Sequence, residues 1–265
     1  MSRGIRVLAG VLALGTCVAL GAQDAQQVVE QAVKTELAAD ASDHSRWLYY
    51  EIERKPGRTV KQWAATTGQG ELDRIMEENG RVLNQKEQRG RMEGFMRDSS
   101  AQEKQRKAGQ HDDQQASQML KMLPQAFIWT KTGTQGNLTL LHFKPNLRFH
   151  PPTYEARVFA AMEGDMAVDT AQHRIASLKG RMIHEVKFGW GLMGELDPGG
   201  TFNVERRQTG GGVWQITETH VHIRGHALLF KNISDQEDDV KSEFKELPQT
   251  LSFLDAENRL MQQGV

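Results

Sequence analysis

Of all the side chains in this sequence, two histidines with the spacing of a strand most resemble a pair of metal ligands. His220 and His222 lie two residues apart in a segment with strand character, so both imidazoles should face the same side. Such a pair, with His226 as a further ligand, suits zinc or copper. Trp214 and Ile216 are expected on that same face, however, and no further acidic or histidine ligand has diagnostic spacing. Solvent-facing histidines are the simpler interpretation, and we expect no metal ion or cofactor.

The remaining polar candidates do not form a catalytic set. His184 lies among apolar neighbours, where a histidine either bonds to the backbone, orients the head of a ligand or joins His220, His222 and His226 as a further metal ligand. Asp165 and Asp169 are predicted to be turn residues that bond to the backbone. Nucleophile-elbow, phosphate-loop and HExxH motifs are absent. The sequence therefore favours a non-enzymatic protein, with an envelope hydrolase or a metal-binding protein that uses the strand histidines as the alternative.

The first 21 residues have the order of a secretory signal peptide. Arg3 and Arg6 precede an uncharged apolar run from Val7 to Ala22, and Ala19-Leu20-Gly21 offers a small-x-small cleavage site. The run is too short for a membrane-spanning helix, which needs about 20 apolar residues. We expect a mature chain of residues 22–265 that is periplasmic or secreted and has no transmembrane segment.

Cys17 is the one cysteine in the sequence. It follows Leu14-Gly15-Thr16, so it is either an apolar residue of the signal peptide or the acylated cysteine of a lipobox, which would anchor the protein to a membrane. Signal cleavage removes two arginines and no acid, so 33 basic residues become 31 against 34 acidic ones and the net charge is near −3. This balance gives no electrostatic reason to expect a nucleic acid partner.

The elements that position these residues begin with a helix and a meander. Apolar residues of the segment 26–39 recur with helical spacing, and residues 48–52 alternate as in a strand with one buried face. Segments 59–67, 71–77 and 81–83 follow, and Asn79-Gly80 is typical of a tight hairpin turn.

A charged segment, residues 87–123, interrupts the strands. It has few large apolar residues before Met119, so we expect a solvated helix that is partly disordered between Asp98 and Gln118 and ends near Pro124. The alternative is a mobile lid, or an arm through which a structural subunit recruits partners.

Strand patterns resume after Pro124. The longest alternation, from Ala176 to Phe188, predicts one half-buried strand with Leu178, Met182 and Val186 on its buried face. We also expect strands at 126–132, 138–144, 201–207, 213–223 and 226–231, a short helix at 154–162 and a terminal helix at 252–263.

This order of elements, with Gly164-Asp165-Met166-Ala167-Val168-Asp169 before the long strand and Gly212-Val213-Trp214 near the last hairpins, resembles the periplasmic lipoprotein carriers LolA and LolB and their uncharacterised relatives. The resemblance covers roughly residues 26–231. It implies an α+β fold, in which helices cover the concave face of a strongly curved antiparallel half-barrel. We expect residues 22–265 to form one such domain.

The resemblance also implies a ligand. The carriers hold acyl chains in an apolar cavity between sheet and helices, so a lipid or acylated ligand, or an envelope protein partner, is expected here. A filled core uses the same residue types and is the alternative. The residues that would line the cavity are Val29, Val33, Leu37, Leu178, Met182, Val186 and Phe188, with His184 as a polar group.

Overall fold

The computed structural model describes residues 16–188, 194–227 and 236–264. Several predicted features lie outside the described part. They are most of the predicted signal peptide, the end of the strand predicted at 226–231, and the side chains of Cys17, Phe188 and His226. The elements, in chain order, are α1 (Thr16–Ser42), β1 (Arg46–Lys55), β2 (Arg58–Thr67), β3 (Gly70–Glu78), β4 (Arg81–Val82), α2 (Gln85–Arg97), α3 (Ser99–Ala126), β5 (Phe127–Gln135), β6 (Leu138–Pro145), η1 (Glu155–Ala161), β7 (Met162–Asp169), β8 (Arg174–Met182), β9 (Val186–Phe188), β10 (Gly194–Leu196), β11 (Thr201–Gln208), η3 (Gly210–Gly212), β12 (Trp214–His222), β13 (Gly225–Ala227), β14 (Gln236–Leu247) and α4 (Phe253–Met261).

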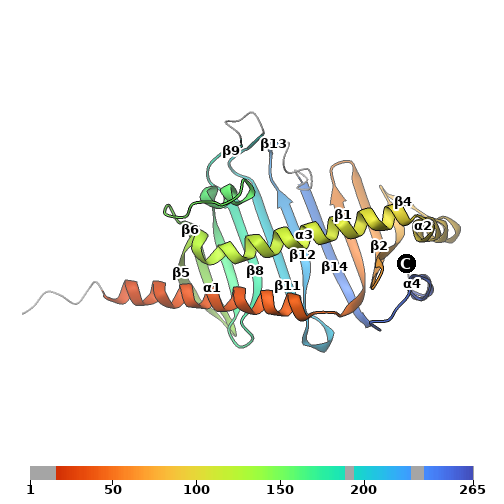
Figure 1. Ribbon diagram of the computed structural model, residues 1–265, viewed down its shortest axis with the longest axis horizontal. Coiled ribbons are helices and arrows are strands. Elements are labelled where there is room, and N and C mark those ends of the chain that lie inside the picture. Colours follow the sequence, from red (N-terminus) through yellow and green to blue (C-terminus); the bar gives the residue numbers. More distant parts are fainter. Residues whose placement is uncertain (1–15, 189–193, 228–235, 265) are drawn as a thin grey trace, which may run out of the picture.

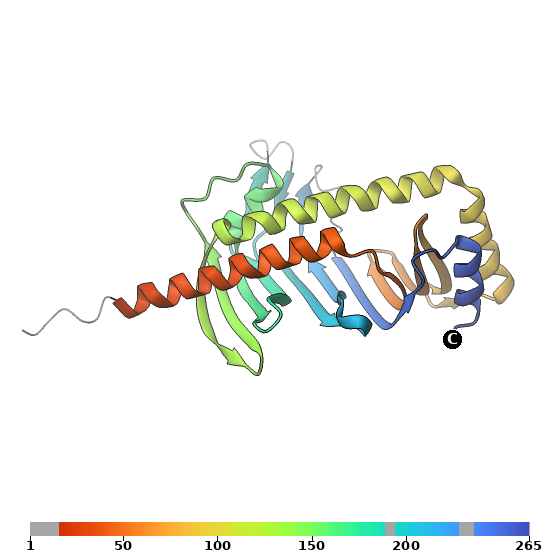
Figure 2. The ribbon, with the colours of Figure 1, turned by 60° about the horizontal axis from the view of Figure 1, so that its bottom comes forward.

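One open antiparallel sheet of 11 strands forms most of the molecule (Figure 1). Its order is β4-β3-β2-β1-β14-β12-β11-β8-β7-β6-β5, so a meander at each end flanks a centre made of β14, β12 and β11. Figure 2 shows that the sheet is curved and that α1 and α3 lie on one side of it. The predicted α+β class, with helices over the concave face of a curved antiparallel sheet, is confirmed.

Strand β14 was missing from the prediction, although it joins the two meanders. It pairs with β1 on one side and β12 on the other. Most of its residues are charged, so its sequence lacks the apolar alternation typical of a half-buried strand. Cross-strand partners compensate several of these charges, for example Lys241 with Glu51 and Asp238 with His220.

The prediction of a single long strand from Ala176 to Phe188 is wrong. Strand β8 ends at Met182, and β9 belongs to a separate sheet with β10 and β13. A register shift against β7 leaves Ala176 without a paired residue and brings Ile175 to the same face as Leu178. The apolar alternation continues through the break because residues on both sides of it are buried against the same core.

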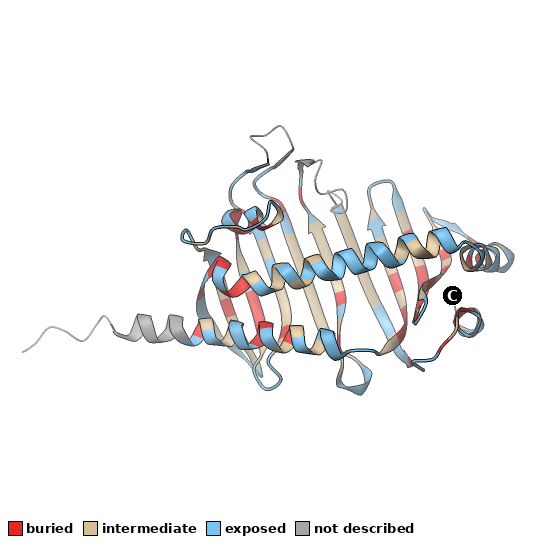
Figure 3. Ribbon diagram, in the orientation of Figure 1, coloured by how far each residue is buried: buried red, intermediate tan, exposed pale blue. Residues whose placement is uncertain are grey.

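The charged segment forms two helices, α2 and α3, which meet at Asp98. Helix α3 runs without a break from Ser99, its N-terminus capped by the side chain of Asp98, and Pro124 lies inside its last turn. In Figure 1 it crosses the whole sheet from the α2 end to β5, while α1 covers the half near β5 to β11. Residues 106–114 of α3 are exposed all around the helix (Figure 3). This stretch therefore spans the sheet without packing on it.

Two apolar clusters hold the helices to the sheet. In the larger one, Ala25, Val29 and Val33 of α1 pack against Leu123 of α3 and Trp129 of β5. In the other, which lies on the opposite face at the far end of the sheet, α2 and α4 cover apolar side chains of β1 to β3. None of the helices in the described residues is long and apolar enough to cross a membrane.

Candidate ligand cavity

A cavity of about 1000 Å³ lies between α1, α3 and the concave face of β8, β11 and β12. Helix α1 contributes Leu37, and the last three turns of α3 contribute Met119, Leu120 and Leu123. Most of the remaining wall is also apolar. Because these helix residues are close to the points where α1 and α3 dock on the sheet, packing fixes the position of the apolar wall.

The floor of the cavity depends on glycines in neighbouring strands. The ring of Phe202 lies over Gly180, where a Cβ atom would be 2.3 Å from the ring, and the ring of Phe143 lies over Gly164, where it would be 2.8 Å away. Both rings line the cavity. A side chain at Gly180 would push the ring of Phe202 upward, whereas one at Gly164 would first meet the backbone oxygen of Lys179 at 2.0 Å. The two glycines therefore let the rings lie close to the sheet.

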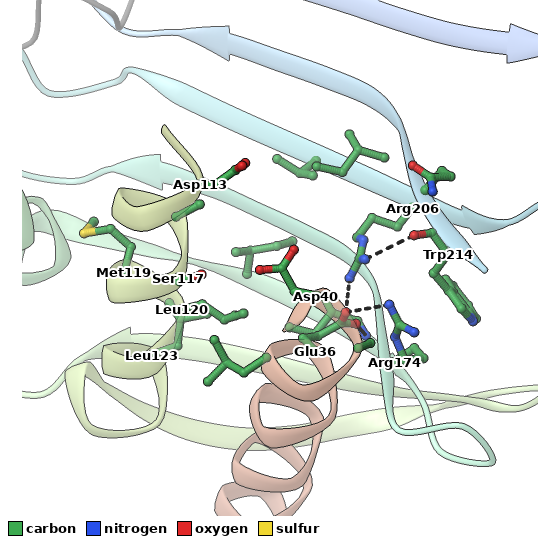
Figure 4. A pocket seen from close by; sticks show the side chains of 18 of the residues that line it. Glu36, Asp40, Asp113, Ser117, Met119, Leu120, Leu123, Arg174, Arg206 and Trp214 are labelled. Carbon is green, nitrogen blue, oxygen red and sulfur yellow. Dashed lines mark hydrogen bonds and ion pairs between the residues drawn. The ribbon is translucent and has the colours of Figure 1, made fainter. Parts of the chain in front are cut away.

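A buried ionic triad forms the polar end of this cavity. The carboxylate of Glu36 on α1 accepts a hydrogen bond from Arg174 on β8 at 2.8 Å and one from Arg206 on β11 (Figure 4). Its other oxygen accepts the backbone N–H of Ile175 at 2.7 Å. Burial alone would raise the pKa of Glu36, but these partners outweigh burial and hold the pKa below its usual range. Glu36 is therefore ionised and fastens the C-terminal half of α1 to the sheet.

The rim of the cavity is acidic. Asp40 and Asp43 at the end of α1 and Asp113 of α3 line it and are exposed to solvent. Partial burial, together with the carboxylates of Asp40 and Asp112, raises the pKa of Asp113 above its usual value. The negative charge at the opening thus contrasts with the arginines inside.

The concave face becomes polar beyond β12. Cross-strand pairing places Val204 of β11, Thr219 of β12, Asp239 of β14 and Glu53 of β1 in one row, and paired residues share a face. The cavity wall therefore continues toward β1 as a surface with charged side chains, which lies beneath residues 106–114 of α3.

Lys241 lies at the centre of this charged surface. Its Nζ is 3.2 Å from Glu51 Oε1 and 3.3 Å from Asp239 Oδ2. Burial raises the pKa of Asp239 to about 7, because the attraction of Lys241 does not offset burial and the repulsion from Glu51. Burial and the carboxylates of Glu71 and Glu51 likewise raise the pKa of Asp73. Burial therefore raises the pKa values of both carboxyl groups in this part of the face.

The predicted site residues are divided between the cavity and the core. Leu37 and Leu178 line the cavity. Val29 and Val33 are buried at the interface of α1 with α3 and the sheet, and Met182 and Val186 are buried in the same core without lining the cavity. His184, predicted among apolar neighbours, lies on an exposed bend between β8 and β9, because the chain leaves the sheet there.

His220 and His222 do face the same side of β12, as predicted, but the expected relation to Trp214 and Ile216 is wrong. A register shift near Thr217 puts the two apolar residues on the opposite face. His220 Nδ1 and His222 Nε2 lie 2.6 Å and 2.9 Å from the same oxygen of Asp238. Hydrogen bonding to Asp238 outweighs burial and raises the pKa of His220. Within the described residues, no group of three His, Cys, Asp or Glu side chains is placed to hold a metal ion.

The two aspartates assigned to turns differ. Asp169 accepts the backbone N–H of Gln172 at 2.9 Å, as predicted. Asp165 lies within β7 instead, with His142 Nδ1 2.9 Å from its carboxylate. Neither aspartate lines the cavity.

The sequence reasoning did not find the triad. The sequence feature that could have revealed it is Glu36, which follows Val29 and Val33 with the spacing of the apolar face of α1 and so has an inward-facing position. Arg206 similarly shares the alternation of Phe202 and Val204. A charge at a position expected to be buried requires a partner, and that requirement was the usable clue.

Comparisons with known proteins give little further information. No family model matches the sequence, and no curated protein matches it. Among solved structures, a domain from Vibrio parahaemolyticus described as an outer membrane lipoprotein-sorting protein is similar over 91% of this chain and 100% of its own, with 9% identity and a TM-score of 0.32. A DUF1329 family protein from Desulfovibrio piger is similar over 83% of this chain and 92% of its own, with 7% identity and a TM-score of 0.27. Both TM-scores lie below 0.5, so the cavity is interpreted from its own residues.

Proposed function

We propose that this protein is a non-enzymatic binder of an apolar ligand, a lipid or an acyl chain, in the bacterial periplasm or envelope. The observation that carries the proposal is the cavity of about 1000 Å³, with walls that are mostly apolar side chains of α1, α3 and the sheet. Pockets for small ligands commonly have volumes of about 300–1,000 Å³ and mostly apolar walls. The signal-like order of residues 1–21 supports the location.

The energetics of an acyl chain agree with this proposal. Each buried methylene contributes about 0.8 kcal/mol, so a twelve-carbon chain gains about 9 kcal/mol. Association costs of about 4 kcal/mol or more reduce this gain. The net value is about 5 kcal/mol or less, which corresponds to a dissociation constant of about 0.2 mM or weaker before any contribution from a head group.

The test is binding with and without a blocked cavity. Native mass spectrometry of protein purified without detergent should reveal co-purified lipid, and fatty acids should displace a fluorescent fatty acid. Leu178→Trp adds bulk inside the cavity, whereas Lys179→Trp changes the adjacent residue on the other face. We expect the first variant to weaken binding about tenfold or more, and the second to bind like the wild type. Equal binding by both variants, or a wild type that binds no lipid, would refute the proposal.

A second candidate function is the binding of an envelope protein through α3. It is favoured by the stretch of residues 106–114, which spans the sheet with all of its side chains exposed. Cross-linking from a photoreactive residue at position 110 in living cells, with position 93 on α2 as the control, tests it. A cross-linked protein specific to position 110 is expected, and none would exclude this function.

A further inference from the structure

The buried triad at the end of the cavity has one positive charge in excess. Two guanidinium groups share one carboxylate, and the side chains of Glu36, Arg174 and Arg206 are 4%, 13% and 20% exposed. Because Glu36 is held ionised, the three side chains carry a net charge of +1 in a largely apolar space. A buried charge without compensation is costly, so the arrangement favours the arrival of one negative charge.

The triad also has more donors than acceptors. Each guanidinium has five N–H groups, and the Glu36 carboxylate already accepts bonds from both arginines and from the backbone. The Nε atoms of Arg174 and Arg206 are buried and have no hydrogen-bond partner. Arg206 makes one long bond of 3.4 Å, from Nη2 to the carbonyl oxygen of Trp214. An additional acceptor with a negative charge would satisfy donors that the protein leaves unpaired.

The position of the triad in the cavity indicates which kind of ligand would carry the negative charge. Arg174 and Arg206, labelled in Figure 4, line the cavity. Leu178 and Phe202 line the same cavity. A ligand that fills the apolar part therefore places one end beside the arginines. The acidic residues of the rim are exposed and hydrated, so they do not neutralise a charge inside the cavity.

We propose that the cavity selects amphiphiles with a single negative charge, whose head group accepts hydrogen bonds from Arg206 and Arg174 while the chain fills the apolar part. The inference rests on the proposed function and adds the chemistry of the head group. A carboxylate of a free fatty acid and a phosphodiester of a phospholipid both have this chemistry.

The test compares ligands with one chain and different heads. A neutral fluorescent probe, N-phenyl-1-naphthylamine, is displaced at pH 7.5 by dodecanoate, dodecanol or dodecylamine. We expect dodecanoate to bind about tenfold or more tightly than dodecanol, and dodecylamine to bind most weakly, since hydrogen bonds to charged groups are among the strongest. Lysophosphatidylglycerol with a twelve-carbon chain distinguishes the sources: tighter binding than dodecanoate indicates a phospholipid, and weaker binding a fatty acid.

Variants assign the preference to the triad. Arg206→Gln removes the excess charge and leaves Arg174 paired with Glu36, whereas Arg207→Gln changes the next residue, which is 65% exposed and pairs with Glu205 and Glu218. We expect the first variant to lose most of the preference for dodecanoate while dodecanol binds as before, and the second to behave as the wild type. Arg206→Lys keeps the charge and should retain much of the preference, which covers the case in which the glutamine variant does not fold.

The outcomes separate the two proposals. A wild type that binds none of the ligands refutes the proposed function itself. Equal affinities for dodecanoate and dodecanol in the wild type refute the head-group inference and leave the apolar site standing. A glutamine variant that weakens both ligands equally would show that Arg206 has only a structural role, and would also overturn the inference.

Discussion

Replacement of Met182 by aspartate tests which face of β8 is buried. Met182 is 1% exposed, lies opposite Met162 of β7 and belongs to the larger apolar cluster. Loss of its buried surface costs about 1.5–3 kcal/mol. Desolvation of a carboxyl group without a partner adds about 2–7 kcal/mol. We therefore expect a loss of about 3.5–10 kcal/mol, which is comparable with the whole stability of many domains.

Lys179→Asp is the matched control, because it introduces the same side chain on the opposite face of the same strand. Lys179 is 51% exposed, and its Nζ pairs with Glu205 Oε1 at 2.9 Å. Loss of an exposed ion pair costs about 1 kcal/mol or less. A third variant, Met182→Ala, leaves a cavity without burying a charge and should cost about 2–5 kcal/mol.

Thermal melts followed by circular dichroism measure all three variants. For a domain of this size, 1 kcal/mol shifts Tm by about 2–4 °C. We expect Lys179→Asp to melt within about 4 °C of the wild type, Met182→Ala roughly 4–20 °C lower, and Met182→Asp to lack a cooperative transition or to melt lower still. Similar melting points for the two aspartate variants, or greater damage from the Lys179 change, would show that the buried face of β8 has been assigned wrongly.

Three further predictions concern the charged face, the cavity floor and the mature N-terminus. The pKa of Asp239 in the folded state, about 7, lies above its ordinary value, so between about pH 4 and 7 the folded protein holds a proton on this carboxyl group that the unfolded chain releases. The free energy of unfolding therefore falls as pH rises from about 4 to 7. Asp239→Asn should remove this loss, so at pH 8 the variant should be more stable than the wild type by up to about 4 kcal/mol. Urea unfolding of both proteins at about pH 5 and pH 8 measures this, and an equal difference in the free energy of unfolding at both pH values would contradict the prediction. Gly180→Val should displace the ring of Phe202 and weaken dodecanol binding about tenfold, whereas unchanged displacement of the probe would show that the floor does not set the depth. The intact mass of protein from a periplasmic extract should correspond to cleavage after Gly21 or Ala22, and an acylated N-terminal Cys17 would replace the soluble form by an anchored one.

The order of elements was largely predictable because it depends on local patterns. The helical spacing of Val29 and Val33 predicted α1, and Asn79-Gly80 predicted the hairpin between β3 and β4, where both residues have positive φ. Ser252 caps α4 at the predicted start of the terminal helix. Such features need only residues a few positions apart, so the sequence contains all the information that they require.

The features that build the site depend on the tertiary structure. Strand β14 is held by partners on β1 and β12, and its own charged residues give no sign of them. The bulges near Ala176 and Thr217 shift the faces of β8 and β12 by one residue, which no alternation pattern reveals because a register is set by the neighbouring strand. Glu36 reaches the backbone of Ile175, 139 residues away in the chain. The sequence by itself determined where the chain turns and which residues prefer burial, and only the folded sheet decided which buried charges meet at the end of the cavity, because the cost of burying a charge depends on partners brought together by long-range strand pairing.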